Sequence, residues 1–416
     1  MGSSPTAWIL FCFVLLSGID KYLAGDNVVS AYPRRDKKNT EVPRRTGDEW
    51  CLTSAFNKSV HSIILGSDWG AVPTSDRKTW KSFGCDSLVL PSLMREQMQN
   101  TNNRDATIQQ LQKLGFYDRA VVKRRYNDRE YYWFGNVGEK DVDYEFKYPW
   151  ELYICPGTIS LDIGTAYGDT LVLMGAANRE GLTFGFELKS GRYMSTEWSA
   201  RLNPDINIIP YNFGVKANGE PEWKIIEEQY SRVVPIAKWV QKRLHFNRKG
   251  TNYLNHVSFI KIDIDGADVD IVRSFAPLIK GMDSNYSSVS STFFRPIFLI
   301  EWFGNFRSKS VDNKKCTTES SAAWTVARDI NYKVFDWRFQ NEFKTCDAAL
   351  QFYDSYEGPK SKSKKHCGSG SNEFDLCDLL LVHADSISQE GSKLKTSCPS
   401  ILEKSIVSSL LQKWSN

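Results

Sequence analysis

Residues 160–169 read SLDIGTAYGD, an apolar run that ends in an acid and passes through a glycine-containing turn into another apolar run. This pattern predicts a strand that turns directly into a helix. Gly164 and Gly168 allow the backbone to approach a ligand closely, and the start of the helix presents N–H groups that no helical carbonyl accepts. The stretch therefore predicts either a ligand-binding turn or a purely structural tight turn of an α/β fold.

The alternation of short apolar runs with helical patterns continues beyond this stretch. Expected strands are 158–161, 182–186, 206–211, 257–262 and 296–300, expected helices are 167–177, 190–202, 236–246, 267–279 and 320–330, and runs at 332–337 and 378–382 could complete the sheet. Strands that alternate with helices form parallel βαβ units covered on both faces. The predicted fold class is therefore α/β, doubly wound and mostly parallel, with an N-terminal elaboration.

Acidic residues stand at the ends of further expected strands. Glu187 follows the strand that comes after Asp162, near the position from which an acid hydrogen-bonds ribose hydroxyls in this architecture. Glu301 follows the strand at 296–300. Because ligands bind outside the carboxyl ends of parallel strands, we expect these acids to line one crevice.

Residues 259–270, FIKIDIDGADVD, form the second cluster, a strand that ends in Asp263, Asp265, Asp268 and Asp270 around a glycine. Two of these acids could cap the next helix. Crowded carboxylates raise one another's pKa and can supply a base, which makes the cluster a candidate reacting centre. A hard cation on three of them is the weaker alternative, and no C-x-x-C spacing supports zinc, so we expect no metal.

The glycine spacing argues against two common nucleotide sites. It is G-x-x-x-G, not the G-x-G-x-x-G of a dinucleotide site, and the Lys-Ser/Thr of a P-loop is absent. An acid at the tip of the strand disfavours a pyrophosphate beside it and suits a cationic ligand. A dehydrogenase is therefore only the third hypothesis.

Together these motifs resemble the FkbM-like class I methyltransferases, which use S-adenosylmethionine. LDIGTAYGD resembles the cofactor loop, FGFEL the ribose-binding strand end, FIKIDIDGADVDIVRSF the K-I-D-x-E-G-x-E signature and FLIEWF the fifth strand. The resemblance covers about residues 155–305, in chain order, and extends toward 385. Asp265 and Asp268 stand where the family usually has Glu.

The resemblance implies in-line transfer of a methyl group from S-adenosylmethionine to a hydroxyl of a small-molecule or glycan acceptor, with catalysis mostly by positioning. Among the acids that could act as the catalytic base, we favour Asp265 and then Glu301. The cofactor-binding residues that the resemblance implies are Asp162, Gly164, Thr165, Gly168, Asp169, Glu187 and Asp263.

A hypothesis from another class is a secreted binding protein that keeps the methyltransferase fold without the activity. A fold does not determine a function, and a lumenal enzyme needs its cofactor delivered across a membrane. Calorimetry with S-adenosylmethionine separates the two hypotheses.

Composition bounds the partners of the chain. The 416 residues carry a net charge of +4, with 25% charged and 41% hydrophobic residues, which is enough apolar material for a sizeable core. So small a net charge does not create the strong positive electrostatic potential that nucleic-acid binding needs, so we expect no nucleic-acid partner. The expected divisions are a signal peptide or short anchor at 1–24, a flexible leader at 25–48, an N-terminal elaboration at 49–150, a methyltransferase-like domain at 151–385 and a tail at 386–416.

The N-terminus predicts a place in the secretory pathway. Residues 7–16, AWILFCFVLL, are too short to span a bilayer, which takes roughly 20 residues, and fit a signal peptide; membrane contact is expected only if the segment is an uncleaved anchor. Eight cysteines follow it, an even number that suggests disulfides, and sequons begin at Asn57 and Asn285. We therefore expect a lumenal or extracellular glycoprotein.

Overall fold

The computed structural model describes twelve stretches of the chain, most of them between residues 149 and 355. They are 104–113, 121–135, 149–226, 229–244, 253–264, 266–281, 294–302, 316, 318, 321–355, 378–388 and 402–414. The expected signal peptide, the leader, most of the N-terminal elaboration and both sequons lie outside these residues. No helix within the described stretches is long and apolar enough to cross a membrane.

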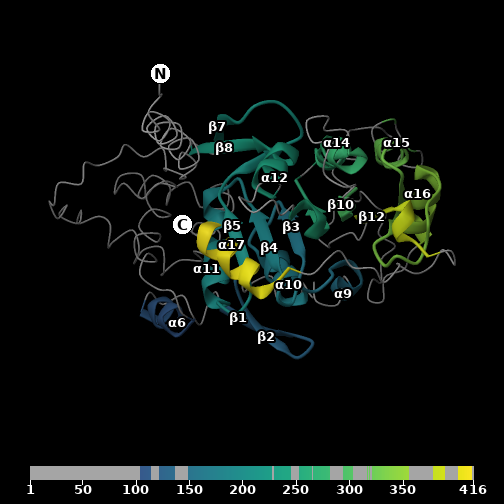
Figure 1. Ribbon diagram of the computed structural model, residues 1–416. Helices are drawn as coiled ribbons and strands as arrows, with labels where there is room; N and C mark the ends of the chain where they lie inside the picture. Colours follow the sequence, from purple (N-terminus) through teal and green to yellow (C-terminus); the bar gives the residue numbers. More distant parts are fainter. Residues whose placement is uncertain are drawn as a thin grey trace, which may run out of the picture.

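A seven-stranded, mostly parallel sheet forms the centre of the structure (Figure 1), in the order β11-β12-β10-β9-β3-β4-β5. Its strands are β3 Ile159–Ile163, β4 Leu182–Phe186, β5 Ile208–Tyr211, β9 Val257–Ile262, β10 Ile297–Glu301, β11 Tyr332–Asp336 and β12 Asp378–His383. The five strands from β5 to β10 are parallel, and β12 runs antiparallel to both of its neighbours. The order of these five is 3-2-1-4-5, the doubly wound order with its switch point between β3 and β9.

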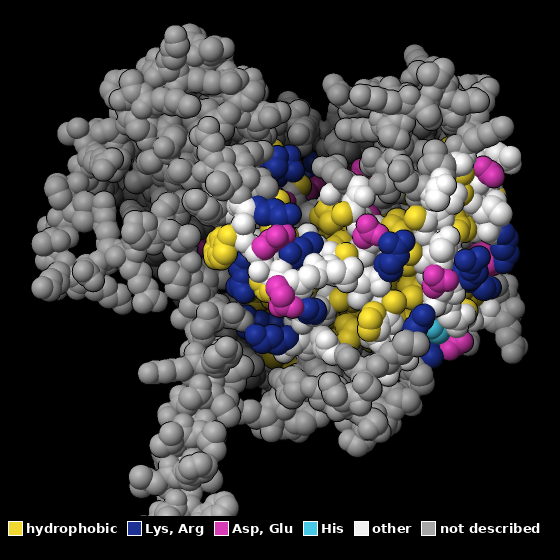
Figure 2. Space-filling view, turned by 90° about the horizontal axis from the view of Figure 1, so that it is seen from above, with side chains coloured by type: hydrophobic (Ala, Val, Ile, Leu, Met, Phe, Trp, Pro, Cys, Tyr) yellow, Lys and Arg dark blue, Asp and Glu magenta, His cyan; other side chains and the backbone are white. Residues whose placement is uncertain are grey.

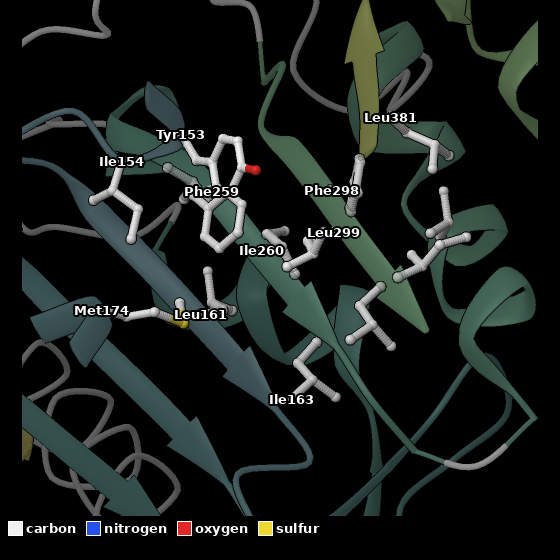
Figure 3. Close-up of a cluster of buried hydrophobic side chains, with 14 of the residues drawn as sticks. Tyr153, Ile154, Leu161, Ile163, Met174, Phe259, Ile260, Phe298, Leu299 and Leu381 are labelled. Atoms are coloured by element: carbon white, nitrogen blue, oxygen red, sulfur yellow. The ribbon is translucent and has the colours of Figure 1, made fainter. Parts of the chain in front are cut away.

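The strands form because their apolar runs are buried on both faces. Every residue of β3, β4 and β9 is buried, as expected for parallel strands covered by helices on both sides. Figure 3 shows Leu161, Phe259 and Phe298 of three neighbouring strands in one apolar cluster, with Tyr153 stacked on Phe259 at a centroid distance of 5.6 Å. This packing fixes the strand ends that carry the acids.

Helices cover the sheet between the strands. They are α9 Trp150–Tyr153, α10 Asp169–Ala177, α11 Ser190–Leu202, α12 Ile236–Leu244, α13 Asp268–Ser274, α14 Ala276–Lys280, α15 Ala322–Asp329 and α16 Cys346–Ser355. The single helix expected at 267–279 is two helices, because Phe275 ends α13, buries its ring completely and starts α14, in which Pro277 follows. The predictions for β4, α11 and β9 are confirmed to the residue.

Further elements lie beyond the central unit. Helix α6, Arg104–Lys113, and the hairpin of β1, Val121–Tyr126, and β2, Arg129–Phe134, precede it, and the hairpin packs on α10 and α11. A small sheet of β6 Gly214–Lys216, β8 Gln229–Pro235 and β7 Glu222–Ile226 was not predicted. The expected tail carries α17, Lys404–Trp414, whose Val407 and Leu410 join the core.

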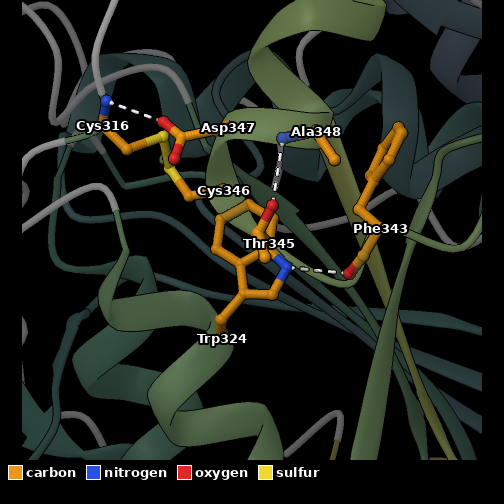
Figure 4. The surroundings of a disulfide bond; sticks show 7 residues. All are labelled: Cys316, Trp324, Phe343, Thr345, Cys346, Asp347 and Ala348. Carbon is orange, nitrogen blue, oxygen red and sulfur yellow. Dashed lines mark hydrogen bonds between the residues drawn. A yellow bond between two sulfur atoms is a disulfide. The ribbon is translucent and has the colours of Figure 1, made fainter.

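A disulfide joins Cys316 to the start of α16 at Cys346, with their Cα atoms 6.0 Å apart (Figure 4). Beside it, the indole N–H of Trp324 donates to the carbonyl of Phe343 at 2.9 Å. Cys155 is also disulfide-bonded. The expectation of disulfides is therefore confirmed for these cysteines.

The surface seen from above mixes the two signs of charge. Figure 2 shows Lys and Arg beside Asp and Glu, with hydrophobic side chains between them, over the described part of this face. Several opposite charges lie within ion-pair distance, such as Lys238 and Glu220 at 2.7 Å.

Candidate functional site at the carboxyl edge of the sheet

The structure brings the acidic strand ends together at one edge of the sheet. Asp162 near the end of β3 lies between Gly185 of β4 and Lys261 of β9 in the strand register. Asp263 follows β9 directly, and Glu301 ends β10, the next parallel strand. Carboxylates from neighbouring strands therefore lie at the topological switch point, where this fold class binds its ligands.

The glycine turn after β3 is pressed against the end of β9. Gly164 has a φ of +84°, and a Cβ placed there would lie 1.9 Å from the carbonyl oxygen of Asp263. The Gly164 N–H donates to the carbonyl of Phe186 at 2.9 Å, and the Thr165 N–H donates to the same oxygen at 3.1 Å. Only glycine fits at position 164, both in conformation and in space.

Gly168 caps α10 in the same left-handed conformation, with a φ of +84°. A Cβ on it would lie 2.9 Å from the Cα of Thr196 on α11. Thr165 is buried, and its hydroxyl lies 3.4 Å from that of Thr196. The turn is thus held between β4, β9 and α11, which preorganises its backbone.

Asp162 is fully buried and shares its carboxylate between two partners. The Thr170 hydroxyl donates to Oδ2 at 2.7 Å, and the Lys261 ammonium lies 3.5 Å from Oδ1. Burial raises the pKa of Asp162, while the charge of Lys261 and the Thr170 hydrogen bond act in the opposite direction. Asp169 at the start of α10 is half-buried, and desolvation raises its pKa to about 6.

Glu187, one residue after β4, ties the glycine turn to the start of α11. Its Oε2 accepts the Ala166 N–H at 3.0 Å, and its Oε1 accepts the Lys189 N–H at 2.7 Å. Burial raises the pKa of Glu187 to about 7, against the stabilising effect of these hydrogen bonds and of Arg192. Each oxygen accepts one backbone donor and keeps capacity for another.

The described carboxylates of the second cluster have different partners. Asp268 is buried and accepts the Gly266 N–H at 3.1 Å and the Ile264 N–H at 3.4 Å, so it holds the turn before α13. Asp270 is exposed and pairs with Arg273. Asp268 thus stabilises the turn that leads into α13, Asp263 pairs with Lys261, and Asp265 lies outside the described residues.

Glu301 lies against Asp263, as the strand register predicts for the residues that follow Ile300 and Ile262. Desolvation, followed by the charge of Asp263, raises the pKa of Glu301 to about 8, and the two side chains share a hydrogen bond. The buried Oε2 of Glu301 accepts no hydrogen bond within the described residues. A carboxylate with a raised pKa and an unused acceptor atom has the properties of a general base.

Lys261 was not singled out from the sequence, although it belongs to the quoted stretch. Its ammonium lies 2.9 Å from Oδ2 of Asp263 and 3.5 Å from Oδ1 of Asp162. The signal was a charged residue inside an otherwise apolar strand, flanked by acids on its own and the neighbouring strand. Buried lysines are rare unless they are paired.

The comparisons with known proteins find similarity among solved structures alone. No protein family and no curated protein matches the chain. Among solved structures, a crystal structure of an S-adenosylmethionine-dependent methyltransferase from Aquifex aeolicus matches with 12% sequence identity and a TM-score of 0.26, covering 47% of this chain and 85% of that chain. The FkbM-like resemblance itself stays a prediction.

The fold is Rossmann-like. Seven strands in the observed order, with helices on both faces, confirm the predicted doubly wound, mostly parallel α/β class. Within the described residues, no three His, Cys, Asp or Glu side chains are grouped so that they could hold a metal ion.

The residues at the edge fit a cationic nucleoside. The turn at Gly164 packs against the backbone of Asp263, and the buried carboxylates of Asp162 and Glu187 lie on the strands beside it. Glu187 has acceptor capacity for hydroxyl donors, and Glu301 has an unused buried oxygen. A sulfonium with ribose hydroxyls suits this donor and acceptor set better than a phosphate does.

Proposed function

We propose that this protein is an S-adenosylmethionine-dependent methyltransferase that methylates a hydroxyl group. The observation that carries the proposal is the convergence of Asp162, Glu187 and Asp263 around a glycine turn at the switch point of the sheet. Three neighbouring strands supply these acids, and their negative charge favours a cation.

Each residue has a role in the proposed reaction. Asp263 lies toward the cationic part of the cofactor, Asp162 adds its negative charge from below the surface, and Glu187 accepts hydrogen bonds from the ribose. When bound, the cofactor supplies a methyl group on a positively charged sulfur. Glu301, whose Oε2 is unused, takes the proton of the acceptor hydroxyl. Asp265, placed two residues after Asp263, is the other candidate for the base.

The acceptor and the compartment are part of the proposal. We place the enzyme in the lumen of the secretory pathway or outside the cell, acting on a small molecule or a glycan. The disulfide between Cys316 and Cys346 supports an oxidising compartment.

Calorimetry of the purified protein with S-adenosylmethionine tests the proposal. We expect a dissociation constant within the range of about 1 μM to 1 mM that is common for enzyme substrates. Asp162→Asn removes the charge while keeping the shape and should weaken binding at least about tenfold. Asp270→Asn changes an exposed acid on α13, outside the turn, and should bind like the wild type.

A labelled methyl donor, incubated with the protein and an extract of the secretory compartment, then identifies the acceptor. If the folded wild type does not bind S-adenosylmethionine at about 1 mM, the enzyme proposal is wrong, and the hypothesis of a non-catalytic binding protein takes its place.

A further inference from the structure

Lys261 occupies the centre of the acidic edge. It lies on β9 beside Asp162 of β3 in the strand register, so the two side chains leave the sheet on the same side. Its side chain is only 8% exposed, and its ammonium lies 2.9 Å from Asp263 and 3.5 Å from Asp162. One cation therefore bridges two of the carboxylates to which the proposed function assigns the cofactor.

The burial of Asp162 requires such a cation. A carboxylate with no exposed surface is stable in its charged form only if charges or hydrogen-bond donors compensate for lost water. Thr170 supplies one hydrogen bond, and the remaining oxygen, Oδ1, accepts no hydrogen bond within the described residues. The charge of Lys261 is thus the main compensation for that oxygen.

We propose that Lys261 is a positioning residue that keeps Asp162 ionised and holds Asp263 toward the crevice, so that the empty site is already charged for a cationic ligand. This inference rests on the proposed function for the identity of that ligand. The other charged groups that act on Asp162 and Lys261 are Asp263 and Asp169, which both repel the Asp162 carboxylate and attract the ammonium.

The proposal predicts what happens without the ammonium. In Lys261→Met, Asp162 loses its compensating charge, so its pKa rises and the group becomes protonated near neutral pH. A neutral Asp162 no longer attracts a sulfonium, and Asp263 loses the ion pair that directs it. We expect binding of S-adenosylmethionine at about pH 7 to weaken at least about tenfold, with part of the affinity regained at higher pH.

The experiment measures cofactor affinity by calorimetry from about pH 6 to about pH 9. It compares the wild type, Lys261→Met, Lys261→Arg and Lys238→Met. Lys261→Arg keeps the charge and should retain the pH profile of the wild type. Lys238→Met removes an exposed lysine that pairs with Glu220 and serves as the matched control, with unchanged affinity.

The thermal unfolding of the same variants without cofactor gives a second reading, which holds even if the protein does not bind S-adenosylmethionine. A carboxyl group whose pKa is higher in the folded state binds more protons when folded, so stability falls as the pH rises through that range. Lys261→Met should show a steeper fall than the wild type, and adding Asp162→Asn should remove the excess.

The outcomes separate the two proposals. Unchanged unfolding profiles in Lys261→Met, or tighter cofactor binding with an unchanged pH profile, overturn the role of Lys261. The expected unfolding profiles without any cofactor binding overturn the proposed function and leave the charge-balancing role of Lys261 in place.

Discussion

At the scale of single residues, the acids at strand ends could be predicted from the sequence, but their hydrogen-bond and ion-pair partners could not. Asp162, Glu187 and Glu301 follow apolar runs whose direction fixes the edge at which they emerge. The sequence does not show which acids are already used by the backbone, and Asp268 proves to hold its own turn. It also does not show that Lys261 reaches two carboxylates, because this depends on the register of β3 and β9.

Gly164→Ala tests the close approach of the glycine turn to β9. Alanine at this position combines a left-handed φ with a clash against the Asp263 carbonyl, so we expect a loss well above the roughly 1 kcal/mol of a strained φ alone, together with loss of cofactor binding. Gly281→Ala is the matched control, because its φ is +64° and no atom lies within 4 Å of the added Cβ. If urea unfolding shows the same loss of unfolding free energy for both variants, the contact between position 164 and the Asp263 carbonyl does not matter for stability.

Glu301 makes the proposed reaction dependent on pH. A base must be deprotonated to accept a proton, and the pKa of Glu301 is raised to about 8 by burial and by Asp263. The methylation rate is therefore expected to rise with pH through about 8 and then level off. Glu301→Gln should abolish this rise and most of the rate. A rate that is independent of pH between about 6 and 9 would remove Glu301 as the base.

At the scale of elements, strands and helices with continuous apolar faces were predictable, whereas short polar strands were not. The bounds of β4, α11 and β9 agree with the sequence pattern because their burial is complete or periodic. The small sheet was missed because β6 has only three residues and β7 only five, too few for a clear periodic pattern. Its attachment comes from tertiary contacts, such as the Ser231 hydroxyl, which donates to the Leu188 carbonyl at 3.3 Å.

The hairpin of β1 and β2 supports the glycine turn from outside the sheet. The Trp133 indole N–H donates to the Tyr167 carbonyl at 3.2 Å, and the Ser195 hydroxyl donates to the same oxygen at 3.0 Å. Trp133→Phe keeps an aromatic ring and removes the donor, so we expect about 1 kcal/mol less stability and severalfold weaker cofactor binding. Trp223→Phe changes an exposed indole and should alter neither quantity. If calorimetry gives Trp133→Phe and the wild type the same affinity for the cofactor, the hairpin does not support the turn.

The disulfide closes a loop of 30 residues that contains α15 and β11. A cross-link around a loop of this length lowers the entropy of the unfolded chain, which in the chain-entropy account raises the free energy of unfolding by about 3–4 kcal/mol. Cys316→Ser should therefore lower the melting temperature by several degrees. A reducing agent should destabilise the wild type by breaking this bond, which the variant does not have. Equal melting temperatures for both proteins under oxidising conditions would contradict this contribution.

At the scale of the whole molecule, buried acids should give the protein an unusual dependence on pH. The pKa values of Asp169, Glu187, Asp268 and Glu301 are raised by burial to between about 6 and about 8. The folded state then holds more protons than the unfolded state from about pH 4 upward, so stability falls as the pH rises through about 8. The melting temperature should be highest in mildly acidic buffer. A melting temperature that is highest above about pH 8 would contradict the burial of these acids.

The position of β12 imposes an order on the synthesis of the fold. This strand comes last in the sheet along the chain, yet it lies between β10 and β11, and within the described stretches β11 pairs with no other strand of the sheet. A nascent chain that has emerged only as far as β11 leaves the edge of β10 bare and β11 without its partner, and bare strand edges invite pairing with other chains. The ribosome must therefore release residues 378–383 before the sheet closes, and a stop codon between β11 and β12 leaves the edge of β10 exposed to pairing with other chains.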